Sequence, residues 1–309
     1  MRAKAKQRPP VQNSPAEMRH WAMLFFTAAI WGSSFILIKR GLFNVDGLEL
    51  FTPLQVGAMR ILFAAMFMLP FIYKRFQTLK DGKFKYLLAV GVFGNGIPAF
   101  LFAIAQTEIP SALAGMLNAL VPVFSMLIGL AVFGVRIKLL QAAGVLIGLG
   151  SAVGLILTTG QLDGSNINVW YALLVVGATL CYGISLNVIK QYLQNESAVS
   201  ITGLALVLVS PVGLVILLST DFVARVNSIE GAWTGIGAMS ILAILGTAIA
   251  LMVFNKMVKE TSTIFASSVT YLIPLIAIIW GVIDGETLAV TQVACALTML
   301  GGIFLINRG

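Results

Sequence analysis

The sequence predicts an all-α integral membrane protein whose ten transmembrane helices form two inverted five-helix repeats. Three observations lead to this prediction: the composition, the number of long apolar windows and an internal duplication. Of the 309 residues, 59% are hydrophobic and 10% are charged, and the mean hydropathy is +0.96. A soluble globule of this size needs far more polar surface, so we expect the chain to be solvated by lipid.

Ten windows of the sequence are apolar and long enough to cross a hydrocarbon core, which takes about 20 helical residues. They lie at 21–40, 54–73, 86–106, 110–133, 139–158, 168–189, 198–218, 233–255, 262–283 and 289–307. The loops between them are short. No separate soluble domain is therefore expected, and any function has to be built within the helix bundle.

One pattern occurs twice along the chain. Residues 31–39, Trp-Gly-Ser-Ser-Phe-Ile-Leu-Ile-Lys, return in outline 151 positions later, at 182–190, as Tyr-Gly-Ile-Ser-Leu-Asn-Val-Ile-Lys. Further matches at shifts of 151 or 152 are Gln141 with Gln292, Gly94 with Gly246, and Pro122 with Pro274. Duplication of an apolar chain is typical of transporters, because a site between two repeats opens to either side when the repeats rock.

The duplication also sets the domain organisation. We predict a first repeat at 19–160 and a second at 161–309, after an N-terminal tail at 1–18 that is rich in Arg, Lys and Pro. Its composition predicts a disordered, cytoplasmic tail. Five spans is an odd number, so the second repeat must be inverted relative to the first.

The basic residues predict the orientation. With a cytoplasmic N-terminus, 16 of the 20 Lys and Arg residues fall on the inner side, and eight of the 12 acidic residues fall on the outer side. This is the positive-inside bias, so both termini are expected in the cytoplasm and the protein in the cell (inner) membrane. The net charge of +8 then reflects topology and contact with anionic lipid, and nucleic acid is not an expected partner.

The residues that could carry chemistry argue against an enzyme. Cys181 and Cys295 both lie within predicted spans at positions that do not correspond in the two repeats, and the lone histidine, His20, stands where the first span begins. This pattern predicts neither a disulfide nor a metal site, and no cofactor is expected. The sequence also lacks the paired intramembrane acids or nucleophile motifs that a membrane hydrolase needs.

Five short motifs follow one another along the chain. They are Ala-Ala-Ile-Trp-Gly-Ser-Ser-Phe at 28–35, Met-Arg-Ile-Leu at 59–62, Ser-Ala-Leu-Ala-Gly-Met-Leu-Asn-Ala-Leu-Val-Pro-Val-Phe at 111–124, Tyr-Leu-Ile-Pro-Leu at 271–275 and Gly-Glu at 285–286. On a duplicated ten-span layout, these motifs resemble the EamA family of the drug/metabolite transporter superfamily. The resemblance covers nearly the whole chain.

This resemblance implies a secondary transporter, most often an exporter of amino acids, metabolites or toxic analogues, with a central cavity lined mainly by helices 1, 3, 4, 6, 8 and 9. The chain departs from the family pattern at one point. After the fourth span the family usually has an acidic residue, where this chain reads Gly134-Val135-Arg136, whereas the second half keeps Glu286. The two halves have therefore diverged at this loop.

Polar side chains inside spans are the candidates for solute binding, because they cost free energy unless they are paired or face a cavity. The predicted substrate-binding residues are Trp31, Ser34, Asn95, Asn118, Tyr182, Asn187, Asn255, Thr270 and Tyr271. The alternative is that such groups only bond backbone carbonyls or neighbouring helices. Asn118 and Tyr271 are favoured because each lies about one turn before a proline. Those prolines, Pro122 and Pro274, are predicted hinges, since each removes a backbone donor and bends its helix.

Charges and glycines leave several alternatives open. Lys39 and Lys190 stand at equivalent repeat positions and are either gate-rim charges or lipid anchors. Transport is either facilitated exchange or coupled to protons through a rim group such as Glu108. The Gly144-x-x-x-Gly148 pattern predicts tight helix packing, within one chain or between the two copies of a homodimer.

We therefore expect a secondary transporter that exports small metabolites such as amino acids by alternating access. An uncharged cavity edged by aromatic residues suits neutral or zwitterionic solutes. The alternative within transport is a multidrug or sugar-derivative carrier of the same superfamily, and the alternative outside it is a non-transporting membrane scaffold. The expected partners are a small-molecule solute and membrane lipid.

Overall fold

The computed structural model describes residues 18–135, 137–159, 169–261 and 268–308. The predicted tail, 1–18, lies outside these residues except for its last position. The first half contains α1 (Met18–Gly32), α2 (Ser34–Leu42), α3 (Pro53–Ile72), η1 (Leu79–Lys83), α4 (Phe84–Gly91), η2 (Val92–Gly96), α5 (Ile97–Ala105), α6 (Ser111–Asn118), α7 (Val121–Phe133) and α8 (Leu139–Thr159). The second half contains α9 (Val169–Tyr192), α10 (Ala198–Ser219), α11 (Phe222–Ser228), α12 (Ala232–Ile241), η3 (Leu242–Ile249), α13 (Ala250–Glu260), α15 (Val269–Ile283) and α16 (Val290–Arg308). The segments labelled η are π-helical.

The predicted spans are found as helices. In the described residues, nine helical stretches are long and apolar enough to cross a membrane, and α15 is a shorter apolar helix of 15 residues. Each lies close to its predicted window, and the first residues of the window at 262–283 fall outside the described residues. The prediction of an all-α membrane protein built from two five-helix repeats is confirmed.

Two spans carry a π-helical turn at equivalent positions of the two repeats. η2 contains Gly94 and η3 contains Gly246, which are 152 residues apart. At the end of η2 the N–H of Ile97 bonds the carbonyl of Val92, five residues earlier, rather than four. Such turns are rare and occur mostly at functional sites. Because the turn is repeated, the third and eighth spans are candidates for a functional role.

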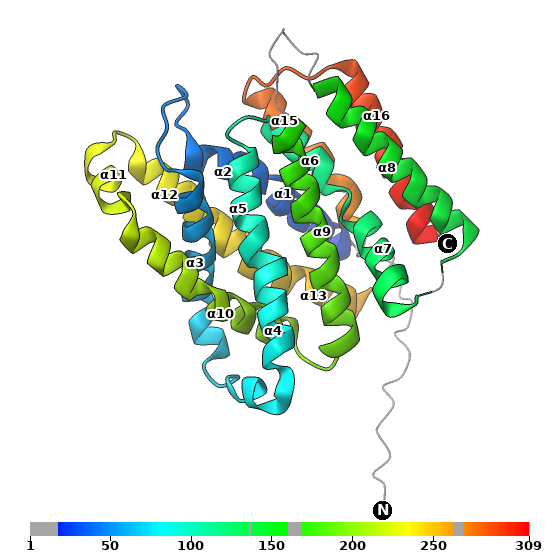
Figure 1. The fold of residues 1–309 in the computed structure, drawn as a ribbon, viewed down its shortest axis with the longest axis horizontal. Helices are drawn as coiled ribbons and strands as arrows, with labels where there is room; N and C mark the ends of the chain where they lie inside the picture. The colour runs from blue at the N-terminus through cyan, green and yellow to red at the C-terminus, as the bar shows by residue number, and fades with distance from the viewer. Residues whose placement is uncertain (1–17, 136, 160–168, 262–267, 309) are drawn as a thin grey trace, which may run out of the picture.

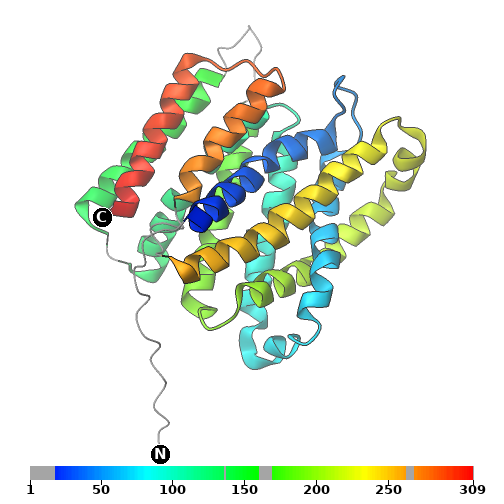
Figure 2. The same ribbon diagram turned by 180° about the vertical axis from the view of Figure 1, so that it is seen from behind.

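The two halves interlock through these turns. The indole N–H of Trp31 on α1 donates to the carbonyl of Gly246 in η3 at 2.9 Å. In the other direction, α9 lies against η2, so closely that a Cβ on Gly94 would stand 2.4 Å from Oγ of Ser185. Figure 2 shows α1 and α2 in blue, between α15 in orange and the golden span formed by α12, η3 and α13. The first span of each half therefore packs on the third span of the other.

The helices α8 and α16 form a pair along one side of the bundle (Figure 1). A Cβ on Gly144 would lie 2.5 Å from the carbonyl oxygen of Gly302, and a Cβ on Gly302 would lie 2.9 Å from the amide nitrogen of Gly148. Only glycine allows the two backbones to approach so closely. The Gly144-x-x-x-Gly148 pattern therefore serves packing within the chain.

The two predicted hinges differ. The fourth span is interrupted: α6 ends at Asn118, α7 begins at Val121, and Pro122 stands in the first turn of α7, where its missing N–H removes no helical bond. Pro274, by contrast, lies inside α15. The helices α6 and α15 cross closely, since a Cβ on Gly115 of α6 would lie 2.2 Å from the Cβ of Ala277 of α15.

The spans run between two ends of the molecule. The Glu286 end carries the turns at 43–52, 106–110 and 284–289 together with α11, and lies toward the top of Figure 1. The Lys190 end carries the start of α1, η1 and the ends of α7, α9 and α16. These two names are used below.

Candidate functional site

An aromatic row connects the first span to the third and sixth. The ring of Phe35 on α2 lies 5.7 Å from that of Phe102 on α5, and the ring of Phe102 lies 6.1 Å from that of Tyr182 on α9. Trp31 stands one turn before Phe35, with its ring 5.2 Å from that of Phe254 on α13. The structure thus places two of the predicted aromatic site residues, Trp31 and Tyr182, where the halves meet.

Asn118 is the predicted site residue whose polar group is most available. It is half-buried at the last position of α6, a helix in contact with α2, α9 and α15. Among the described residues its amide has no hydrogen-bond partner. A primary amide that offers two donors and an acceptor beside a helix break is suited to bind a polar solute.

Three predicted residues use their polar atoms to join helices. The buried amide of Asn187 donates to the carbonyls of Ser125 at 2.8 Å and Gly183 at 2.9 Å, so it holds α9 on α7. The hydroxyl of Tyr271 accepts from the amide of Asn307 at 2.7 Å, and Trp31 bonds η3 as described. Such interhelical bonds stabilise membrane bundles by about 1 kcal/mol each.

Of the remaining predicted residues, two form hydrogen bonds within their own span, and the other two are placed only by their position in a helix. Ser34 donates to the carbonyl of Ile30 at 3.3 Å, and Asn95 donates to that of Val90 at 3.5 Å. Thr270 is half-buried in the first turn of α15. Asn255 belongs to α13, and its side chain lies outside the described part of the chain.

Sequence reasoning missed an ionic cluster at the Glu286 end. The ammonium of Lys39 on α2 lies 2.5 Å from Oδ2 of Asp284 and 2.8 Å from Oε1 of Glu286, and Arg40 pairs with Asp284 as well. The two carboxylate side chains are only 6% and 5% exposed. Of the two alternatives for Lys39, these ion pairs within the protein favour the gate rim.

The Glu286 carboxylate also binds the start of the fourth span. Its Oε1 accepts the backbone N–H of Ser111 at 2.8 Å, and its Oε2 accepts that of Ala112 at 2.9 Å. These are the first two amides of α6, whose helix dipole favours a negative charge there. We call Lys39, Arg40, Asp284, Glu286 and the first turn of α6 the latch, because together they tie the first, fourth and ninth spans at one end.

A cavity of about 520 Å³ opens beside the latch. Its lining includes Lys39, Gln106, Thr107, Glu108, Asp284 and Glu286. The Gln106 side chain is 3% exposed, and neither its amide nitrogen nor its amide oxygen has a partner among the described residues. Buried polar groups are nearly always paired, so a buried amide with both of its polar atoms unpaired is unusual.

The equivalent turn and lysine at the Lys190 end form different contacts. A left-handed glycine follows each of α7 and α15: Gly134, with φ +63°, is the residue after α7, and Gly285, with φ +77°, is the second residue after α15. The two glycines are 151 residues apart. The following residue is Val135 in the first half and Glu286 in the second. Lys190, the counterpart of Lys39, is exposed and forms no ion pair with a described residue. The contacts of Glu286 therefore have no counterpart among the described residues of the equivalent turn; the described ion pair between Lys83 and Glu196 at this end joins η1 to the loop after α9 instead.

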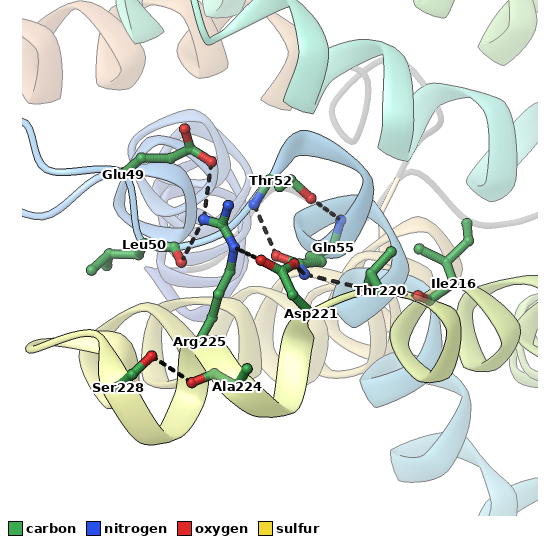
Figure 3. A network of polar contacts seen from close by, with 10 residues as sticks. All are labelled: Glu49, Leu50, Thr52, Gln55, Ile216, Thr220, Asp221, Ala224, Arg225 and Ser228. Atoms are coloured by element: carbon green, nitrogen blue, oxygen red, sulfur yellow. Dashed lines mark hydrogen bonds and ion pairs between the residues drawn. The ribbon is translucent and has the colours of Figure 1, made fainter.

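A second polar network at the Glu286 end holds the second span to the loop before α11 (Figure 3). Gln55 is fully buried and donates to Oδ1 of Asp221 at 2.8 Å, while its side chain and Thr52 form a capping box at the start of α3. Arg225 bonds Asp221 at 2.8 Å and Glu49 at 3.0 Å. The Arg225 guanidinium lowers the pKa of the Asp221 carboxyl, and these contacts make the network a structural staple.

The architecture defines the class of protein. A helical membrane bundle built from two inverted repeats, whose halves meet at π-helical turns, is the architecture of a membrane transporter. The model of the EamA-like transporter family matches residues 19–157 and again residues 169–308. The chain belongs to this family, as its motifs predicted.

Relatives agree with this assignment. YedA of Escherichia coli K12, described as an uncharacterized inner membrane transporter, is 24% identical over 300 residues, which cover 93% of this chain and 90% of YedA. A protein of Salmonella typhimurium named "Probable amino-acid metabolite efflux pump" is 24% identical over 291 residues, covering 92% and 93%. A solved crystal structure shares the fold with a TM-score of 0.59 at 16% identity, covering 94% and 96% of the two chains. The protein is a multi-pass membrane transporter.

Proposed function

We propose that the protein exports small neutral or zwitterionic metabolites, amino acids first among them, across the inner membrane by alternating access. The observation that carries this proposal is the latch. It ties three spans at the Glu286 end, whereas the equivalent turn at the Lys190 end offers Val135. A repeat protein whose equivalent ends are differently closed is what alternating access requires.

The charge distribution supports one orientation. The basic residues of the Lys190 end include Arg19, Lys74, Arg75, Lys85, Lys138, Lys190 and Arg308, against acids that include Glu196 and Glu260. The described acids of the Glu286 end are Asp46, Glu49, Glu108, Asp221, Glu230, Asp284 and Glu286, against the bases Lys39, Arg40 and Arg225. The positive-inside rule assigns the first set to the cytoplasm. In this orientation the latch closes the external face, and a solute enters from the Lys190 end.

The solute site in this proposal centres on Asn118. Its unpaired amide binds the polar head of the solute. The row of Phe35, Phe102 and Tyr182, in which Phe35 and Phe102 are buried in this structure, becomes an apolar wall when the site opens. Trp31, Asn187 and Tyr271 contribute by holding the helices that form the site, and Ser34, Asn95, Asn255 and Thr270 remain proposed members. The break before Pro122 and the proline inside α15, Pro274, act as hinges. The name of the Salmonella relative supports amino acids as the first solutes to test.

Counterflow in proteoliposomes tests this function, with labelled amino acids offered one at a time. Saturable exchange that is lost in Asn118→Ala is expected, because the alanine removes the amide that binds the solute. Asn227→Ala is the matched control, since Asn227 is an exposed asparagine on α11. Exchange of bulky cations or sugar conjugates alone would favour a drug or sugar-derivative carrier, and absence of any exchange by folded protein would contradict transport.

The same assay determines the coupling. Glu108 is exposed on the wall of the 520 Å³ cavity, where a carboxyl group can exchange protons with the solvent. An imposed pH gradient that drives uptake in the wild-type protein and fails in Glu108→Gln would assign proton coupling to this group. An unchanged pH profile in the variant would leave facilitated exchange.

A further inference from the structure

The Gln106 amide is a buried polar group that the closed structure does not use. Its side chain is 3% exposed and borders the cavity beside the latch, and both amide atoms lack partners among the described residues. The hydroxyl of Ser111, at the start of α6, is in the same condition. Leaving such groups unpaired costs free energy, so both are expected to find partners in another state of the protein.

The latch next to them already has the chemistry of a carboxylate site. Two backbone amides of α6 and the Lys39 ammonium bind the two oxygens of Glu286 at 2.8–2.9 Å. Lys39 has three donor hydrogens, of which the described contacts use two. A free carboxylate of similar shape would find the same donors, and in addition the Gln106 amide and the Ser111 hydroxyl.

We propose that the latch is an external binding subsite for the carboxylate of the solute, and that Glu286 occupies this subsite while the external face is closed. The proposal rests on the export function proposed above. When the latch opens, the solute carboxylate takes the place of the Glu286 carboxylate on α6 and Lys39, and Gln106 donates to it. The displaced Glu286 then faces the solute.

The charges balance only for a zwitterion. The latch contains two cations, Lys39 and Arg40, and two carboxylates, Asp284 and Glu286. A solute with one carboxylate and one ammonium leaves this sum unchanged, because its ammonium can pair with the displaced Glu286. A bare anion or a bare cation would leave one unpaired charge in a nearly buried site, which is costly. The subsite therefore selects α-amino acids over amines and amides of the same size.

Glu286 acts in this arrangement as a tethered competitor. A group held by a short chain is present at an effective concentration in the millimolar range, so a solute at the external face competes with it for the same donors. Return of Glu286 to α6 displaces the solute outward. At the Lys190 end the equivalent residue is Val135, so solute entering there meets no such competitor.

The test uses a cysteine reporter, and its readout does not depend on flux. Ser111→Cys is made in a Cys181→Ala, Cys295→Ala background and labelled by a membrane-impermeant maleimide. Ser111 is 1% exposed, so labelling is slow while the latch is closed. We expect Glu286→Gln to accelerate labelling about tenfold, because it removes charge-assisted bonds to α6 and Lys39. Glu230→Gln is the control, since it removes an exposed carboxylate of the same end outside the latch.

Protection by added ligands identifies what the subsite binds. The Glu286→Gln reporter has one negative charge fewer in the latch, so in this variant a bare carboxylate restores the charge balance. Acetate and L-leucine are therefore expected to slow labelling, and leucinamide, which lacks the carboxylate, is not. The Gln106→Ala change should weaken protection by L-leucine several-fold. If carboxylates and leucinamide protect equally, or neither protects, the proposal is overturned.

Two further arms keep the interpretation clear. Thr107→Cys, on the cavity wall, replaces the Ser111 reporter if that variant does not fold. Thr107 is half-buried, so its labelling starts faster, and the same order of protection by the ligands is expected. Carboxylate protection without counterflow of any solute would support the subsite and contradict the export function. Counterflow without carboxylate protection would support export and overturn the subsite.

Discussion

The two ends of this transporter are built from equivalent elements and closed by different chemistry. At each end a left-handed glycine, Gly134 or Gly285, follows a span of the bundle. A lysine, Lys190 or Lys39, stands at the equivalent position of the first span of each half. At one end the next residue is Glu286, which binds Lys39 and α6. At the other end it is Val135.

This difference shows how two structurally equivalent ends can differ in the free energy that keeps each of them closed. Hydrogen bonds to charged groups contribute about 1.5–3 kcal/mol each, and changing a two-state equilibrium from 1:99 to 99:1 takes about 5.5 kcal/mol. A single carboxylate that accepts three such bonds is therefore sufficient to decide which end of the molecule is closed at rest.

The largest expected effect comes from removing the cation of the latch. Lys39→Met leaves two carboxylates that are nearly buried with only Arg40 beside them, and breaking a buried ion pair in this way costs about 3 kcal/mol or more. We expect a clear fall in the thermal unfolding temperature of the purified protein. Lys190→Met, at the equivalent and exposed position, should leave that temperature nearly unchanged. Equal effects of the two variants would show that the ends are not different.

A smaller effect is expected from building an acid into the Val135 turn of the Lys190 end. Val135→Glu places at this turn the residue type that the second half has at Glu286, at the same end of the bundle as the exposed Lys190. We expect exchange in proteoliposomes to slow several-fold, because both ends then have a carboxylate to close on. Adding Lys190→Met to this variant should restore the rate. An unchanged rate in Val135→Glu would indicate that the two turns are not equivalent in function.

The smallest effect is expected at the Asp221 network, which shares the Glu286 end with the latch but whose carboxylates, Asp221 and Glu49, are exposed. Arg225 lowers the pKa of Asp221, so this carboxylate stabilises the fold above its unfolded-state pKa, and the contribution is lost as pH falls through its lowered folded-state pKa. Asp221→Asn should therefore lower the unfolding temperature slightly at neutral pH and have no effect in acid below that pKa. A large, pH-independent loss would contradict the assignment of this network as an exposed staple.

Much of the fold could be predicted from the sequence, because lipid solvation forces long apolar windows and duplication leaves a visible 151-residue shift. The close packing at Gly144 and Gly148 was also predicted correctly, because two helix backbones come this close only where the residues are glycine, and glycines are visible in the sequence. The π-helical turns at Gly94 and Gly246 could not be predicted, since they depend on how the first span of the opposite half packs against them.

Only part of the latch could be predicted from the sequence. The divergence between Val135 and Glu286 was noted from the sequence, but the carboxylate owes its role to the start of α6, 174 to 175 residues away in the chain. Asn187 illustrates the opposite case. It has the residue type of a site, and the structure uses its amide to bridge α9 and α7, a geometry that spacing alone does not reveal.

The most direct test of the account is a distance measured across the Glu286 end. Spin labels at Val45, which is 77% exposed in the turn after α2, and at Thr287, in the loop before α16, report separation of the latch by double electron–electron resonance. We predict one short distance in the wild-type protein and a second, longer population in Glu286→Gln. The same single distribution in both proteins would contradict the claim that Glu286 holds this end closed.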